Sequence, residues 1–276
     1  MALRRNSSTI TFPNLAGSRE SVAGPRRPDT DNHDNGGFNF VASLCTPGDA
    51  DLCLIPDKSA TLAVVSETGH TAGVSPFGRV VLVASLGGMQ AFIAVLAGLP
   101  AAFAVPVAVV QHRPFLSGRH DPLVAVLSRK TGLPVRSAQD RAPAQTSGVA
   151  VVPGSTTATI DASGHWLLSR GCRDEGPGDA LLTSSADAGP TIAVIMSGYQ
   201  SDGARGCRAV KARGGRVLVQ DPSTARAPSM PVNAIATGCA DFVLPLDRIA
   251  AAVVALTTAP GAADLLRVPL PPWARL

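Results

Sequence analysis

The stretch Arg79-Val80-Val81-Leu82-Val83-Ala84 leads directly into the turn Ser85-Leu86-Gly87-Gly88. Its apolar residues follow one another without the polar alternation of a half-exposed strand, which is typical of strands buried on both faces, as in parallel sheets. Two further runs of this kind lie at residues 105–110 and 191–196. Helical patterns separate the runs, so the sequence predicts an α/β fold that is doubly wound, with a mostly parallel sheet and helices on both faces in three layers (αβα).

Two helices can be placed between the predicted strands. Residues 88–99 carry Phe92, Val95 and Leu96 at helical spacing, so this helix is expected to pack these three side chains inward. A second helix is expected over residues 122–130. Both helices would contribute to the outer layers of the fold.

A polar residue with catalytic potential follows each of the three apolar runs. Ser85 comes directly after the first run and His112 two residues after the second, while Asp202 lies in the segment 197–203 that follows the third. Since ligands of open parallel sheets bind outside the carboxyl ends of the strands, the three side chains are expected to converge at one edge. A hydroxyl becomes a good nucleophile when a base takes its proton, and an imidazole acts as that base when a third group orients it and stabilises its charge. The three residue types match nucleophile, base and orienting acid.

Each of these residues also has a structural interpretation. The Gly-rich turn after Ser85 would equally suit a phosphate-binding loop. Asp202 precedes Gly203 at the expected start of a helix that runs to Arg213, where an aspartate commonly caps the first turn. His112 could be a buried, hydrogen-bonded imidazole. The residues alone leave these alternatives open.

The region from about residue 78 to residue 256 resembles the catalytic domain of the chemotaxis receptor methylesterases, the protein-glutamate methylesterase or CheB family. The nucleophile turn matches at residues 84–88, the histidine turn at 111–114, and the aspartate loop at 196–198 and 201–204. Further matching blocks, in the same order along the chain, are Val152-Pro153-Gly154, Gly214-Gly215, Val219-Gln220-Asp221, Met230-Pro231, Ala234-Ile235 and the run from Thr237 to Pro245.

The resemblance implies an enzyme that hydrolyses glutamyl methyl esters on the signalling helices of methyl-accepting chemotaxis-type receptors. In many members of the family it also implies deamidation of receptor glutamines. Ser85 would be the nucleophile, His112 the base and Asp202 the orienting acid of a Ser-His-Asp triad. No cofactor and no metal ion would be needed.

Backbone N–H groups of Leu86, Gly87 and Tyr199 are expected to stabilise the oxyanion. Leu86 stands where the family commonly has a threonine, so one hydroxyl donor is missing, whereas Tyr199 replaces a methionine whose backbone donor survives the change. The pair Asp174-Glu175 puts negative charge in a segment that usually carries a basic residue and borders the substrate cleft. These departures leave open a catalytically silent relative that serves as a receptor-binding or regulatory module.

The chain is expected to consist of three parts. Residues 1–77 form a largely disordered or weakly ordered extension, because its first part is too polar to bury a core, although residues 61–65 could form a strand or a docking segment. The extension is too short for the receiver domain that many family members carry. Residues 78–258 form the catalytic domain, and residues 259–276 form a Pro-rich tail.

Composition argues against several other classes. Only 4% of the residues are aromatic, which disfavours base stacking on single-stranded nucleic acid, and no nucleic-acid-binding motif accompanies the net charge of +4. The 5 cysteines have no CxxC spacing, so neither a disulfide framework nor a zinc site is expected. Residues 80–110 are uncharged, but glycines and prolines interrupt them, which favours buried strands and a helix over a membrane span. The N-terminus lacks the apolar core of a signal peptide, so we expect a cytoplasmic protein.

Overall fold

The computed structural model describes residues 75–114, 121–171, 176–259, 261–265 and 269. All of them belong to one compact unit, Val65–Leu276. The expected extension up to residue 74, its segment 61–65, the pair Asp174-Glu175 and most of the Pro-rich tail lie outside the described residues.

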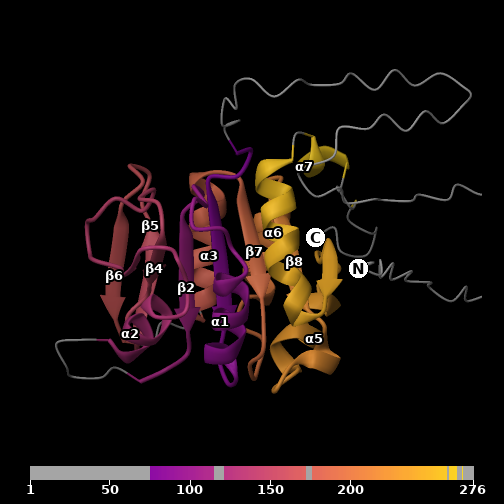
Figure 1. Ribbon diagram of the computed structural model, residues 1–276, viewed down its shortest axis with the longest axis horizontal. Helices are drawn as coiled ribbons and strands as arrows, with labels where there is room; N and C mark the ends of the chain where they lie inside the picture. Colours follow the sequence, from indigo (N-terminus) through magenta and orange to yellow (C-terminus); the bar gives the residue numbers. More distant parts are fainter. Residues whose placement is uncertain (1–74, 115–120, 172–175, 260, 266–268, 270–276) are drawn as a thin grey trace, which may run out of the picture. The chain divides into compact units, whose positions relative to one another are not determined.

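A seven-stranded parallel sheet forms the centre of this unit (Figure 1). Its strand order is β3-β4-β2-β1-β7-β8-β9, and every neighbouring pair is parallel. Strands β5 and β6 form a separate antiparallel hairpin, which the sequence analysis did not predict. The doubly wound α/β prediction is confirmed. The strands are β1 (Arg79–Ala84), β2 (Val107–Gln111), β3 (Val135–Ser137), β4 (Val149–Val151), β5 (Thr156–Ile160), β6 (Trp166–Arg170), β7 (Thr191–Ile195), β8 (Arg216–Gln220) and β9 (Phe242–Leu244).

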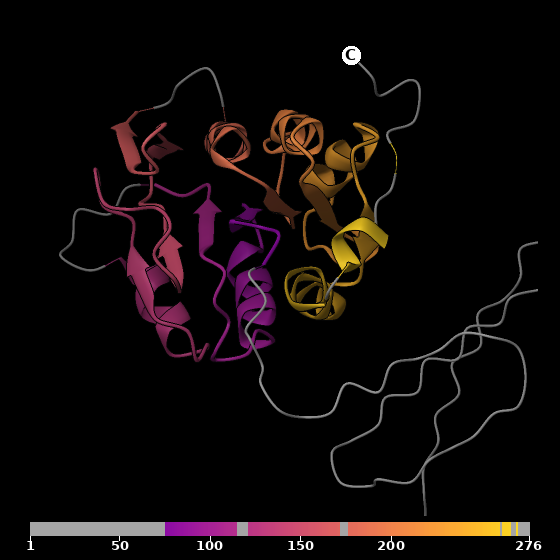
Figure 2. The ribbon, with the colours of Figure 1, turned by 90° about the horizontal axis from the view of Figure 1, so that it is seen from above.

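Helices cover both faces of the sheet, as the view from above shows (Figure 2). Helices α1, α2 and α6 pack on one face, and helices α3, α4 and α5 pack on the other together with the hairpin. The helices are α1 (Gly88–Ala97), α2 (Pro122–Ser128), α3 (Pro177–Ala188), α4 (Ala204–Ala212), α5 (Ser229–Ala236), α6 (Leu246–Thr258) and α7 (Ala262–Leu265), with a 3-10 turn at η1 (Pro222–Thr224).

Burial on both faces explains the unbroken apolar runs in the sequence. In β1, Val80 and Leu82 pack toward α1 and α6, whereas Val81 and Val83 pack toward α3 and α4. Since successive side chains of a strand point to opposite faces, a strand between two helical layers needs apolar residues at every position.

Both predicted helices are present. Helix α1 buries Phe92, Val95 and Leu96 as expected. Helix α2 begins at Pro122 as expected, and its N-cap is Asp121, which accepts a hydrogen bond from the Leu123 N–H group. Among the described helices, none is long and apolar enough to cross a membrane.

Strand register brings the ends of β1, β2 and β7 to one edge. Ala84 of β1 pairs with Gln111 of β2, and Val83 pairs with Ile195 of β7. Backbone pairing continues beyond the strands, because the Ser85 N–H group donates to the Ser197 carbonyl at 2.9 Å. The segments that follow the three strands therefore meet at the carboxyl edge, as predicted.

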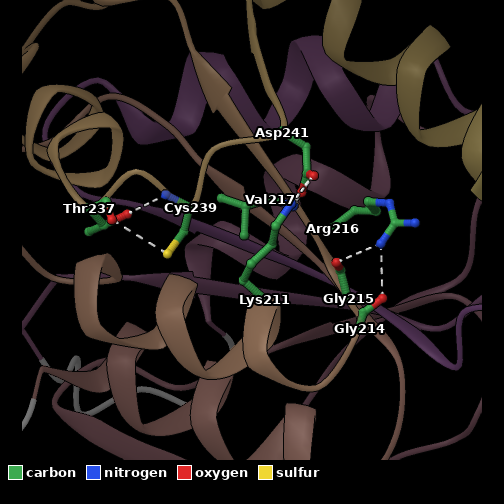
Figure 3. A network of polar contacts seen from close by, with 8 residues as sticks. All are labelled: Lys211, Gly214, Gly215, Arg216, Val217, Thr237, Cys239 and Asp241. Carbon is green, nitrogen blue, oxygen red and sulfur yellow. Dashed lines mark hydrogen bonds and ion pairs between the residues drawn. The ribbon is translucent and has the colours of Figure 1, made fainter. Parts of the chain in front are cut away.

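A buried ion pair lies at the amino ends of strands β8 and β9 (Figure 3). Lys211 of α4 donates to Asp241, which precedes β9, and Asp241 also accepts the Val217 N–H group of β8 at 2.8 Å. The side chains of Lys211 and Asp241 are 8% and 0% exposed. The pair ties α4 to the two strands β8 and β9.

Candidate active site

The turn that carries Ser85 depends on a glycine. Ser85 follows β1, and α1 begins at Gly88, whose N–H group donates to the Ser85 carbonyl at 3.0 Å. Between them, Gly87 has a φ of 82°, in the left-handed region that favours glycine. A Cβ atom on Gly87 would also lie 2.8 Å from the Ser197 Oγ atom and from the Arg226 Cβ atom. A larger residue at this position would therefore displace the turn.

The segment after β7 passes closely against the same turn. A Cβ atom on Gly198 would lie 2.9 Å from the Ser85 Cβ atom and would overlap the sulfur of Met230. Only glycine allows this approach of the backbone at residue 198 to Ser85. Tyr199 is the next residue along the chain. The Tyr199 side chain itself is exposed.

Three backbone N–H groups in the segments that follow β1 and β7 have no partner among the described residues. Within the part of the chain that the structure describes, the N–H groups of Leu86, Gly87 and Tyr199 make no hydrogen bond. These are the three groups that the sequence analysis named for the oxyanion. The Ser85 hydroxyl makes no hydrogen bond with the described residues either, so its link to His112 is not formed in this arrangement.

His112 and Asp202 are in contact. The His112 Nε2 atom lies 2.7 Å from the Asp202 Oδ2 atom, and the two side chains are 30% and 4% exposed. Despite this short distance, Nε2 makes no hydrogen bond of good geometry. The imidazole ring is therefore not oriented for a regular N–H···O angle. Hydrogen-bonding proximity to Asp202 raises the pKa of His112 above its ordinary value of 6.5; burial opposes this effect, and the charges of Asp202 and Asp179 reinforce it.

Asp202 is held by the first turn of α3. Its Oδ2 atom accepts the Gly178 N–H group at 2.9 Å, and its Oδ1 atom accepts the Asp179 N–H group at 2.8 Å. A Cβ atom on Gly176 or Gly178 would collide with this carboxylate. Burial favours a higher pKa for Asp202, but the close contact with His112 and the hydrogen bonds from Asp179 and Gly178 outweigh burial and lower the pKa below its ordinary value. The carboxylate is therefore fixed and ionised.

The expectation that Asp202 could cap its own helix is wrong. The N-cap of α4 is Gly203, at a φ of 92°, and α4 has no side-chain cap of its own. Asp202 instead caps α3, whose N-cap residue, Gly176, has no side chain to do so. A carboxylate is favourable here because the N-terminus of a helix presents free N–H groups and partial positive charge.

Asp179 of α3 caps the first turn of α4 in the same way. Asp179 lies in the first turn of α3, and its Oδ1 atom accepts the Gly206 N–H group of α4 at 2.7 Å. Burial raises the pKa of Asp179 above its ordinary value, against the hydrogen bond from Gly206. Helices α3 and α4 thus cap each other through two aspartates. This reciprocal capping fixes Asp202 beside His112.

Three cavities surround these residues. One of about 300 Å³ adjoins Gly87 and Ser197, behind the nucleophile turn. A second of about 370 Å³ adjoins the histidine and aspartate and is lined by His112, Gly176, Asp179, Gln200, Ser201, Asp202 and Arg205. The third, of about 360 Å³, opens between His112 and the β5–β6 hairpin and is lined by Gln111, His112, Arg113, Ser155, Thr156, Thr157, Gly171, Gly176, Pro177 and Gln200. His112 therefore lines two of these cavities.

Sequence reasoning missed Ser197, Gln220 and Asp179. Ser197 and Gln220 stand at the carboxyl ends of β7 and β8, so the rule that selected Ser85 and His112 could have found them. No sequence signal marks Asp179, because its role depends on how two helices pack. Among the described residues, no group of three or more His, Cys, Asp or Glu side chains could hold a metal ion.

A parallel α/β sheet with a serine turn and a histidine–aspartate pair at its carboxyl edge places the protein in the class of α/β domains built like hydrolases. Comparison with known families makes this class specific. Residues 80–253 match the family of the CheB methylesterase, and the chain belongs to that family.

Individual relatives agree with the family match. The chain is similar to the protein-glutamate methylesterase FrzG of Myxococcus xanthus, with 36% identity over 184 residues, which covers 65% of this chain and 54% of the relative. It is 34% identical over 209 residues to a protein-glutamate methylesterase/protein-glutamine glutaminase of Moorella thermoacetica, covering 72% of this chain and 49% of the relative. The chain thus spans about half the length of these curated relatives.

A solved structure agrees as well. The crystal structure of the Thermotoga maritima CheB methylesterase catalytic domain superimposes with a TM-score of 0.60 at 31% identity. The match covers 66% of this chain and 99% of that domain.

Proposed function

We propose that this chain is a protein-glutamate methylesterase that hydrolyses glutamyl methyl esters on methyl-accepting chemotaxis-type receptors in the cytoplasm. Deamidation of receptor glutamines would be a second reaction at the same acyl group. Membership of the CheB methylesterase family supports the proposal, as do relatives that are named protein-glutamate methylesterase and protein-glutamine glutaminase. Residues 78–258 would form the catalytic domain, with residues 1–77 and 259–276 as extensions.

In the first half of the reaction, the Ser85 Oγ atom attacks the ester carbonyl while His112 takes the Ser85 proton. Because Nε2 of His112 faces Asp202, the proton goes to Nδ1. Asp202 stabilises the imidazolium that forms. The N–H groups of Leu86, Gly87 and Tyr199 donate to the oxyanion. The tetrahedral intermediate then expels methanol, which takes the proton from His112 and leaves the glutamyl group bound to Ser85.

In the second half, water attacks the glutamyl-serine ester. His112 removes a proton from the water and returns it to the Ser85 Oγ atom, so that the receptor glutamate and the free serine are regenerated. With a glutamine substrate the leaving group is ammonia instead of methanol. Neither reaction requires a cofactor.

One observation carries the proposal: the contact between His112 and a fixed, ionised Asp202 at the sheet edge that also bears the Ser85 turn. A rival function is a silent receptor-binding module. Leu86 favours this rival, since it is 40% exposed where the family commonly places a hydroxyl.

The test is methanol release from methylated receptor fragments by the purified full chain. Wild type should release methanol, and Ser85→Ala should not. Ser128→Ala, which changes an exposed hydroxyl on α2, serves as the matched control and should act like wild type. Binding of receptor fragments without methanol release would favour the silent module, whereas release that persists in Ser85→Ala would show that another residue is the nucleophile.

A further inference from the structure

We propose that Ser197 is a positioning residue that holds the nucleophile turn in its reactive geometry. This inference rests on the proposed role of Ser85 as nucleophile. Ser197 is 2% exposed and follows β7, the strand next to β1. Its hydroxyl donates to the Leu86 carbonyl at 2.7 Å, and its own carbonyl accepts the Ser85 N–H group at 2.9 Å. Ser197 therefore hydrogen-bonds the backbone both before and after the Ser85 side chain.

The hydrogen bond to Leu86 also sets the direction of a donor. In a trans peptide the C=O and N–H bonds point in opposite directions. The Leu86 carbonyl is directed at the Ser197 hydroxyl, so the N–H group of the same peptide, which belongs to Gly87, is directed away from Ser197. This N–H group has no partner among the described residues. Ser197 thus orients one of the proposed oxyanion donors without touching the substrate.

Ser197 is itself held by hydrogen bonds to Gln220 and Ala227. Its N–H group donates to the Gln220 Oε1 atom at 3.0 Å, and its hydroxyl accepts the Ala227 N–H group at 2.9 Å. Gln220 is held in turn, because its Nε2 atom donates to the Thr224 carbonyl at 2.9 Å. Every polar atom of Ser197 is engaged, so the turn is connected through β7 to the end of β8.

The expected result is a selective loss of turnover. Without the Ser197 hydroxyl, the peptide of Leu86 and Gly87 loses its anchor. Misplacing a reacting group or an oxyanion donor lowers rates about 100-fold in known enzymes, so we expect Ser197→Ala to lower kcat about 10- to 100-fold. The KM should stay within about threefold of wild type, because the hydroxyl is buried away from the substrate. Ser197→Thr, which keeps the hydroxyl, should restore most of the activity.

The experiment compares Ser197→Ala and Ser197→Thr with a matched structural control, Ser184→Ala. Ser184 on α3 also donates to a backbone carbonyl, that of Ala180, and accepts a backbone N–H group, that of Ile160. The control loses a similar pair of hydrogen bonds away from the turn. A melting curve of each variant reports the general loss of stability.

Two readouts separate this inference from the proposed function. Methanol release depends on the receptor substrate, whereas covalent labelling by a fluorophosphonate needs the nucleophile turn and His112 but no receptor. In the labelling reaction the Ser85 oxygen bonds to phosphorus, fluoride leaves, and His112 takes the proton. Slower labelling of Ser197→Ala, recovery in Ser197→Thr and unchanged labelling of Ser184→Ala would support the inference even if no methanol is released.

Several results would overturn it. Equal labelling rates in Ser197→Ala and wild type would show that the turn keeps its geometry without the hydroxyl. Equal losses in Ser197→Ala and Ser184→Ala would reduce Ser197 to a general stabilising residue. A wild-type protein that neither releases methanol nor is labelled at Ser85 would overturn both the inference and the proposed function.

Discussion

Asp202→Asn should lower both the stability of the fold and the pKa of His112, because the same carboxylate supports both. The carboxylate accepts N–H groups from Gly178 and Asp179 and contacts His112 with the Oδ2 atom. An asparagine has a single acceptor oxygen, so its NH₂ group must face either the Asp179 N–H group or both the Gly178 N–H group and His112. Losing one hydrogen bond to a buried charged group costs about 1.5–3 kcal/mol. For a domain of this size that corresponds to a melting temperature lower by about 4–10 °C.

The pH dependence follows from the two pKa shifts. The lowered pKa of Asp202 means that its carboxylate stabilises the fold above its unfolded pKa of about 3.9 and that this contribution is lost as the pH falls through the lower folded value. The stability difference between wild type and Asp202→Asn should therefore be full at pH 7 and shrink below about pH 4. The raised pKa of His112 stabilises the fold below pH 6.5 and is lost as the pH rises through the folded value.

NMR titration of His112 and thermal unfolding measure both effects. The pKa of His112 should lie above 6.5 in wild type and fall in Asp202→Asn, since Asp202 is the main cause of its rise. Esterase activity, which needs neutral His112, should rise with pH with a midpoint above 6.5 in wild type. Asp179→Asn is the matched control: it removes the charge of the corresponding cap on α4 but keeps an oxygen that can accept the Gly206 N–H group. Its cost should be smaller, also because burial already disfavours the ionised form of Asp179.

An Asp202→Asn protein that melts within about 1 °C of wild type at pH 7 would contradict the predicted loss of stability, because about 1 kcal/mol shifts the melting temperature by about 2–4 °C. An unchanged pKa of His112 would refute the second half, because the contact at 2.7 Å would then have no electrostatic consequence.

Two further predictions concern buried charges away from the site. Lys211→Met should lower the free energy of unfolding by about 3–5 kcal/mol in urea denaturation, because Asp241 is left buried without its cation; Arg213→Ala, which breaks an exposed ion pair with Asp187, should cost less than about 1 kcal/mol, and equal costs would contradict this account. Arg79→Met should raise the melting temperature, because Arg79 is 2% exposed and its Nε and Nη2 atoms find no partner in the described part of the chain. Burial lowers the pKa of Arg79 to about 10, so the higher melting temperature of Arg79→Met should return to that of wild type as the pH rises above this value. A variant that melts below wild type at pH 7 would refute the prediction.

Much of the fold was predictable because buried parallel strands leave a local signal. The apolar runs at residues 79–84, 105–110 and 191–196 became the neighbouring strands β1, β2 and β7. The β5–β6 hairpin was not predicted, since β5 (Thr156–Ile160) contains three threonines and β6 (Trp166–Arg170) is only partly buried, so that neither strand shows an unbroken apolar run.

The apolar runs in the sequence place the segments bearing Ser85, His112 and Asp202 after strand ends, and parallel pairing brings these ends to one edge of the sheet. The role of Asp202 at this edge depends on the packing of the helices. Asp202 caps α3, a helix whose first turn lies 24 residues earlier in the chain, because the two helices α3 and α4 pack with their N-termini together and the N-cap of α3, Gly176, has no side chain. Likewise, the hold of Ser197 on Leu86 spans 111 residues. Such contacts depend on which strands and helices become neighbours, and no local pattern of residues encodes that.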